Sequence, residues 1–236
     1  MAGPTPSEAD NPFRDNQAID DENDIAEPAA AAGFKKYLMY YTASRLDVTL
    51  HLHTKSSPAM YYVQSKLTSL MLLLRRGADT RTAPVVAFAK MRAMSRHMLL
   101  GRGDYEALQA RSATDQIAWE ELRREKSLLR RSDYVFNTAA AATAFRWRKD
   151  RNGALKTVYE CVVDDGAEGG NDGRVVARLF SGGALNFKKG GEIDVAEGLD
   201  TVLEEMLLMS ALAIWAMEAL DYQSLRKGYD SSGKKI

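Results

Sequence analysis

The chain has 236 residues, of which 45% are hydrophobic and 27% are charged, and its formal net charge at pH 7 is zero. These values are ordinary for a soluble globular protein, and the length allows one large all-β domain or two small ones. Cys161 is the one cysteine, which excludes a disulfide within the chain. A single free thiol indicates a reducing, intracellular compartment.

Residues 1–33 differ from the rest of the chain in charge. They hold eight acidic residues, one basic residue (Arg14) and four of the six prolines. This leader therefore carries −7 and residues 34–236 carry +7. It lacks the basic start and apolar stretch of a secretory signal, and its one-sign charge predicts disorder. We hypothesise that it regulates the protein by folding back over a basic face and competing with an anionic ligand.

From residue 36 onward the chain breaks into short segments with strand character. In residues 46–53 the apolar residues, beginning with Leu46, alternate with polar ones, as in a strand with one buried face. Turn-forming pairs such as Asn152-Gly153 separate the segments. About eleven or twelve strands are expected, at 37–41, 46–53, 59–64, 69–74, 85–91, 95–100, 117–122, 134–136, 143–149, 155–163, 174–180 and 192–195.

The middle of the chain has a less clear pattern. Residues 104–111 fit either a short helix or a loop. Residues 117–125 have helical propensity because they are rich in Glu and Arg, although we interpret 117–122 as a strand.

The segment 206–217 contains no charged residue and is hydrophobic on every side. A helix of this kind is either wrapped by protein or crosses a membrane, and twelve uncharged residues are fewer than the roughly 20 that a bilayer needs. We therefore expect a buried helix at about residues 201–225. The spacing of Thr201 and Glu204 fits a capping box at its start, and residues 229–236 are expected to be a frayed tail.

Short strands followed by one buried helix predict a mainly β fold. The expected architecture is a closed barrel of about twelve strands around a buried hydrophobic C-terminal helix, formed by residues 34–228. The apolar part of the helix would be about 22 Å long, which matches the inside of a barrel with strands of modest length.

The order of several segments is distinctive, although no single short motif is. The segments are Trp119-Glu-Glu-Leu-Arg-Arg-Glu125, Tyr134-Val-Phe136, Phe145-Arg-Trp147-Arg148-Lys149, residues 155–161, Val175-Val-Ala177 and the late apolar helix. In this order they resemble the tubby C-terminal-like family, which includes the LURP-one-related proteins and the phospholipid scramblases, and especially a fungal branch of it. The resemblance covers about residues 34–220 and implies a twelve-stranded barrel threaded by a hydrophobic helix. It also implies phosphoinositide binding, for which tubby relatives are known.

Five basic residues form the candidate site for lipid head groups: Arg123, Arg124, Arg146, Arg148 and Lys149. Alternation along residues 143–149 sends Phe145 and Trp147 inward and the two arginines between and after them outward. Guanidinium groups on one strand face can make paired hydrogen bonds to phosphate oxygens. The alternative interpretation is a solvated charged face that nearby glutamates neutralise.

Three other features are weaker candidates. His51 and His53 would lie on one side of a strand, as a metal site needs, but two exposed or hydrogen-bonded histidines are the simpler interpretation. The acidic loop 164–173 lacks the spacing of an EF-hand, so we interpret it as a flexible hairpin loop rather than a calcium site. Cys161 is expected to be buried and inert. No metal, cofactor or catalytic motif is predicted.

These features predict a non-enzymatic module that binds anionic, phosphoinositide-like phospholipid head groups at a membrane surface. The alternative is a structural or protein-interaction barrel without a lipid ligand. Lipid scrambling is less favoured because the uncharged segment is too short to span a bilayer. We expect a cytoplasmic monomer, peripheral at membranes, whose partner is an anionic phospholipid or a protein, with no transmembrane segment and no nucleic-acid ligand.

Overall fold

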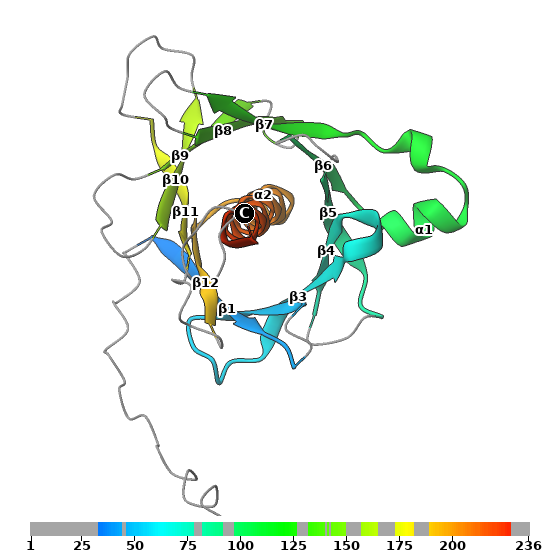
Figure 1. Ribbon diagram of the computed structural model, residues 1–236, viewed down its shortest axis with the longest axis horizontal. Helices are drawn as coiled ribbons and strands as arrows, with labels where there is room; N and C mark the ends of the chain where they lie inside the picture. Colours follow the sequence, from blue (N-terminus) through cyan, green and yellow to red (C-terminus); the bar gives the residue numbers. More distant parts are fainter. Residues whose placement is uncertain are drawn as a thin grey trace, which may run out of the picture.

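Twelve antiparallel strands form a closed barrel in the computed structural model (Figure 1). The structure describes residues 33–43, 46–77, 82–91, 97–126, 132–139, 141, 143–149, 157–164, 173–181 and 189–227, with only the backbone described at 126, 132, 157 and 220–227. Each strand pairs with its neighbours in sequence, and β1 pairs with β12 to close the sheet. The predicted fold class is confirmed.

The strands follow one another as an up-and-down meander. Their bounds are β1 Phe34–Tyr41, β2 Val48–Leu52, β3 Ala59–Lys66, β4 Met71–Arg76, β5 Val85–Met91, β6 Met98–Arg102, β7 Glu120–Lys126, β8 Ser132–Thr138, β9 Thr143–Lys149, β10 Thr157–Asp164, β11 Val175–Ser181 and β12 Lys189–Ala196. The helices are α1 Tyr105–Ala110 and α2 Thr201–Lys227, with short 3-10 turns η1 Leu67–Ser69 and η2 Thr114–Gln116.

Two expectations about strand position were wrong. Leu46 precedes β2, and its side chain is 51% exposed, so it does not belong to the buried face of that strand. The strand expected at 117–122 begins three residues later as β7, because Ile117 and Trp119 pack outside the barrel wall. Residues 104–111, which fitted a helix or a loop, contain α1.

Several expectations concern parts of the chain outside the described residues. These parts are residues 1–32 of the leader, the tail 228–236, the Asn152-Gly153 turn and most of the loop 164–173.

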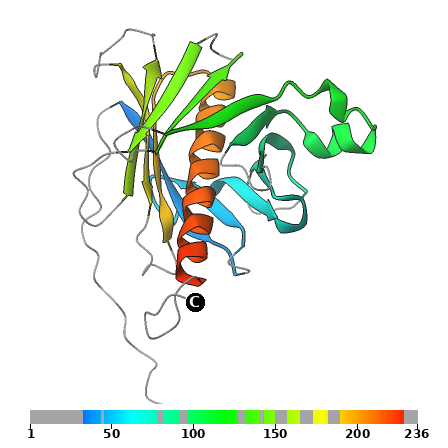
Figure 2. The same cartoon turned by 45° about the horizontal axis from the view of Figure 1, so that its top comes forward.

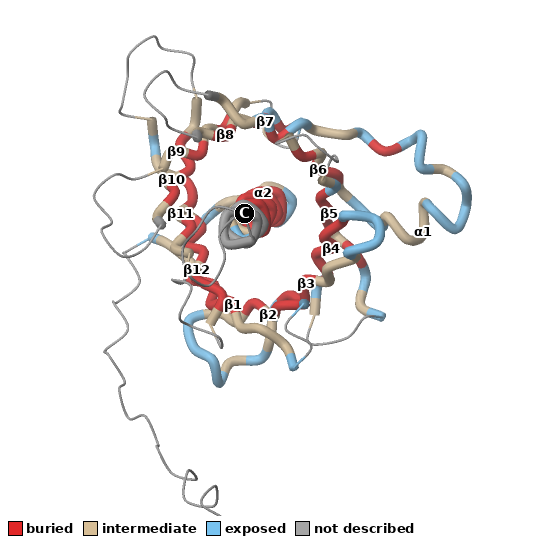
Figure 3. Tube along the Cα trace, in the orientation of Figure 1, coloured by how far each residue is buried: buried red, intermediate tan, exposed pale blue. Residues whose placement is uncertain are grey.

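The barrel interior is filled by α2, which Figures 1 and 2 show passing through its centre. Residues on the inner wall are buried together with every side of the helix from Met206 to Ile214 (Figure 3). The one polar side chain in this part of the helix is Ser210. It accepts a hydrogen bond from Trp147 Nε1–H (3.0 Å) and donates one to the Leu207 carbonyl (2.8 Å), so burial leaves it satisfied.

The start of α2 has a different cap from the expected one. Asp200 Oδ1 accepts the backbone N–H groups of Val202 and Leu203, so Asp200 is the N-cap and the expected capping box at Thr201 is wrong. The carboxylate of Glu204 is therefore available for contacts with the barrel wall.

Buried carboxylates fix the N-terminal end of α2 in the barrel. Glu204 accepts hydrogen bonds from the hydroxyl of Tyr37 and from Lys35 Nζ. Glu205 accepts two from the guanidinium of Arg76, the closer at 2.6 Å. Burial raises the pKa of Glu205, and the hydrogen bond from Arg76 opposes that shift. These contacts join the helix to β1 and β4 and so set its rotation and depth.

The other end of α2 is held by three contacts. Trp215 Nε1–H donates to the carbonyl of Gly190 (3.1 Å). Glu218 accepts hydrogen bonds from Lys149 Nζ (3.2 Å) and from the hydroxyl of Tyr159 (2.9 Å). Both ends of the helix are therefore attached to the barrel by directional contacts.

A second apolar layer lies outside the barrel, where α1 and η2 cover β4 and β5. Phe88 contacts the rings of Tyr105 and Trp119 there, at centroid distances of 5.1 and 5.3 Å. The apolar residues Met71 and Leu73 face this layer, while Leu72 and Leu74 face the interior. This double burial explains the unbroken run Met-Leu-Leu-Leu at the start of β4.

Acid is expected to weaken the attachment of α1. Burial by itself would raise the pKa of Glu106, but hydrogen bonds from Lys66 (2.6 Å) and Arg75 (2.7 Å) outweigh it and lower that pKa. A lowered carboxyl pKa contributes stability above its unfolded value of about 4.3, and this contribution is lost as pH falls through the folded pKa. Glu106→Gln should therefore lower the urea midpoint at pH 7 and have a smaller effect at pH 3. An equal effect at both pH values would contradict the assignment.

Candidate functional site

The outer face of β7, β9, β10 and β11 carries a network of alternating charges. Arg146 Nη1 contacts Glu125 at 2.7 Å and its Nη2 contacts Asp164 at 3.0 Å. Arg123 also contacts Glu125 (3.3 Å), while Arg178 contacts Glu160 (3.0 Å). Burial would lower the pKa of Arg146, but hydrogen bonds to the two carboxylates raise it, so its charge is retained and matched by acidic neighbours.

The five basic residues predicted for lipid binding do not share one surface. Arg124 pairs in register with the buried Tyr134, and its guanidinium lies 5.9 Å from the centre of that ring. Lys149 binds Glu218 of α2 and lies 5.4 Å from the ring centre of Tyr159. Both therefore face the barrel interior near its rim. The other three, Arg123, Arg146 and Arg148, lie on the outer face, as the alternation predicted for Arg146 and Arg148.

The two sets of connections between strands differ in the charge of their sequences. Because the sheet is a meander, every connection from an odd to an even strand lies at the end where the C-terminal half of α2 emerges. We call this the basic end. Its connections are residues 42–47, 67–70, 92–97, 127–131, 150–156 and 182–188. In the sequence these connections contain basic Arg45, Arg92, Arg96, Arg130, Arg131, Arg151, Lys156 and Lys188 against acidic Asp47 and Asp150. The eight basic residues and Asp150 lie outside the residues that the structure describes, so only the strand ends beside them are placed.

The opposite end, which we call the acidic end, has the reverse balance. Its connections are 53–58, 77–84, 103–119, 139–142, 165–174 and 197–200. In the sequence they contain acidic Asp79, Asp104, Glu106, Asp115, Asp165, Glu168, Asp172, Glu197 and Asp200 against basic Lys55, Arg81, Arg111 and Arg174. Of these, Glu106 lies beside the barrel wall, where it contacts Lys66, and residues 79, 81, 165, 168 and 172 lie outside the described residues. The charges of the connections are read from the sequence. Which connections belong to the same end of the barrel follows from the strands that they join.

Three exposed leucines lie at the basic end. Leu46, Leu67 and Leu70, which we call the leucine tip, are 51%, 61% and 39% exposed. Ser65 Oγ donates to the Leu46 carbonyl (2.7 Å) beside the turn that holds the other two. The N–H of Met91 donates to the Leu70 carbonyl (2.8 Å). The ends of β2, β3, β4 and β5 thus present apolar side chains together.

His51 is held by short contacts to neighbouring polar groups, and Cys161 is buried. His51 Nδ1 lies 2.7 Å from the Ser57 carbonyl and its Nε2 lies 3.0 Å from Thr49 Oγ1, whereas His53 lies beyond the end of β2. Within the described ranges, no three His, Cys, Asp or Glu residues are grouped as a metal ion would require. Cys161 is buried as predicted, and burial raises the pKa of its thiol.

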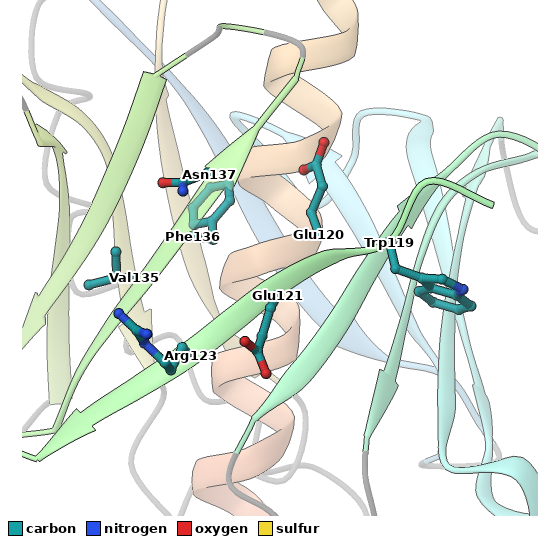
Figure 4. A pocket seen from close by; sticks show the side chains of 7 residues that line it. All are labelled: Trp119, Glu120, Glu121, Arg123, Val135, Phe136 and Asn137. Atoms are coloured by element: carbon teal, nitrogen blue, oxygen red, sulfur yellow. The ribbon is translucent and has the colours of Figure 1, made fainter.

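One cavity was not predicted from the sequence. It lies in the barrel wall between β7 and β8, has a volume of about 320 Å³ and is shown in Figure 4. Glu120, Glu121 and Arg123 line it from β7, and Phe136 and Asn137 line it from β8. The sequence offered no signal for it, because it depends on where β7 changes its pairing partner.

Comparison with protein-family models, with curated proteins and with solved structures found no match to this chain. In the part of the chain that the structure describes, no helix has the length and hydropathy required to cross a membrane.

Proposed function

We propose that the protein is a non-enzymatic module that docks peripherally on an anionic phospholipid surface, with its basic end toward the membrane. The observation that supports this proposal is the exposed leucine tip, and the sequence of the connections that begin and end at the same strand ends is basic. Positive charge draws the module to the leaflet, and the exposed leucines can then enter the interface.

The expected energies are sufficient for reversible binding. Each basic residue near an anionic surface contributes roughly 1 kcal/mol. Burial of a leucine side chain contributes roughly 1.5–3 kcal/mol at most, and partial insertion contributes less. Several such contributions together outweigh the loss of rotational and translational freedom on docking.

The outer arginine face is a secondary part of the proposal. Arg146 would have to exchange Glu125 or Asp164 for a lipid phosphate, which limits the net gain. Arg123 is more available, since its side chain is 58% exposed and has one carboxylate at 3.3 Å. Arg124 and Lys149 are not proposed to contact lipid. Their role is to stabilise the rim of the barrel.

Vesicle flotation tests the docking surface. The protein should float with vesicles that contain phosphatidylserine or phosphoinositide and remain unbound with phosphatidylcholine alone. Serine at Leu46, Leu67 and Leu70 together should weaken binding about tenfold, because apolar area is lost from the interface. Met60→Ser, which changes a 43% exposed side chain at the start of β3, is the matched control.

Two results would contradict the proposal. One is equal binding to neutral and anionic vesicles, and the other is the absence of binding at low ionic strength, where the attraction is strongest. Absence of binding would favour the protein-interaction alternative.

A further inference from the structure

The cavity between β7 and β8 arises because β7 changes its partner. Glu120 to Leu122 pair with β6, and Arg123 to Lys126 pair with β8. The remainder of β8, from Phe136 to Thr138, pairs only with β9. Figure 4 shows the two strands diverging from this point, with the side chains of Glu120 and Asn137 on opposite sides of the opening.

Glu120 lines this opening and has, beneath its surface, one carboxylate oxygen without a partner in the described part of the chain. Its side chain is only 9% exposed. Oε1 accepts hydrogen bonds from Thr138 Oγ1 and from the Ala139 N–H, both at 3.1 Å, and lies 4.0 Å from Arg102 Nε. Oε2 is buried and has no hydrogen-bond partner among the described residues. An unpaired buried carboxylate oxygen is costly, so it marks a position where a donor would bind favourably.

The other walls define what kind of donor fits. Glu121 adds a second carboxylate at the rim, while the one guanidinium that lines the cavity, that of Arg123, already contacts Glu125. Phe136 supplies an apolar surface and Trp119 an aromatic one. An anionic group would face the bare oxygen of Glu120 and be repelled, whereas a cationic N–H donor would satisfy it.

We propose that this cavity binds a primary ammonium or guanidinium group on a short apolar arm, with the nitrogen donating to Glu120 Oε2 after a rotation of the side chain that turns this buried oxygen toward the cavity. A volume of about 320 Å³ is at the lower limit for ligand sites, so it suits a small amine or one lysine or arginine side chain rather than a cofactor. The site lies in the barrel wall next to the acidic end and is independent of the proposed lipid docking.

Isothermal titration of the full chain tests the site with two probes and one uncharged analogue. The probes are 2-phenylethylamine and a short acetylated, amidated peptide containing one lysine, and the analogue is 2-phenylethanol. At least one probe should bind. Binding of phenylethylamine alone would indicate a free amine as the ligand, and binding of the peptide alone would indicate a lysine side chain. The analogue should bind about tenfold or more weakly, because it lacks the charge-assisted hydrogen bond.

Glu120→Gln is the decisive variant. Its amide oxygen can still accept from Thr138 and Ala139, but its NH₂ group would meet the cation, so affinity should fall about tenfold or more. Glu197→Gln, which removes one carboxylate at an exposed residue that does not line the cavity, is the matched control and should leave the affinity unchanged. Unchanged affinity in Glu120→Gln, equal affinity for amine and alcohol, or no binding of either probe would overturn the proposal. Should Glu120→Gln fail to fold, the comparison of amine with alcohol on the unaltered chain decides.

Discussion

Replacing Arg130 and Arg131 by glutamate is expected to weaken binding to anionic vesicles by at least about thirtyfold at low salt. The two residues belong by sequence to the connection between β7 and β8, which lies outside the described residues. Loss of two positive charges removes roughly 2 kcal/mol of attraction, and the two new negative charges add repulsion. Flotation with phosphatidylserine vesicles at about 50 mM and 300 mM salt measures the effect, which should shrink as screening increases.

The same change of charge at the other end of the barrel provides the control. Lys55→Glu with Arg174→Glu alters the net charge equally, but both residues are described by the structure and lie beside strand ends at the acidic end. This variant should keep most of the binding. Equal losses in the two variants would mean that net charge, rather than the basic end, determines the attraction.

Trp147→Ala is expected to lower the free energy of unfolding by about 3–5 kcal/mol. The indole is fully buried between β9 and α2 and donates to Ser210 Oγ at 3.0 Å. Removal of a large aromatic side chain loses its transfer free energy and leaves a cavity that the closed barrel cannot collapse to fill. Trp147→Phe keeps most of the apolar contact and should cost about 1–2 kcal/mol, mainly the hydrogen bond and the smaller volume. Urea unfolding followed by circular dichroism measures both variants.

Trp119→Ala serves as the comparison for this prediction. Trp119 packs against Phe88 outside the barrel wall and is only partly buried. Its removal should cost clearly less than the removal of Trp147. A similar or larger cost would show that the helix inside the barrel contributes little to stability.

Local patterns predicted the strands because each depends on few residues. Phe145 and Trp147 alternate with arginines, and the structure places the aromatic side chains inward. The same rule applied to residues 46–53 failed at Leu46, since alternation does not show where a strand begins. The rule places Lys149 on the inner face together with Phe145 and Trp147, and there its side chain reaches Glu218, so including Lys149 in the lipid site disagreed with the alternation.

The sequence by itself determined the architecture, because a two-residue alternation and a helix that is apolar on every side each leave few ways to bury their surfaces. It also determined the total charge of the connections. Only the tertiary structure decided which connections share an end of the barrel, which residues hold α2 in place and where Glu120 meets the opening beside β8. Those features depend on strand register and closure, which join residues far apart in the chain and leave no mark in any short segment.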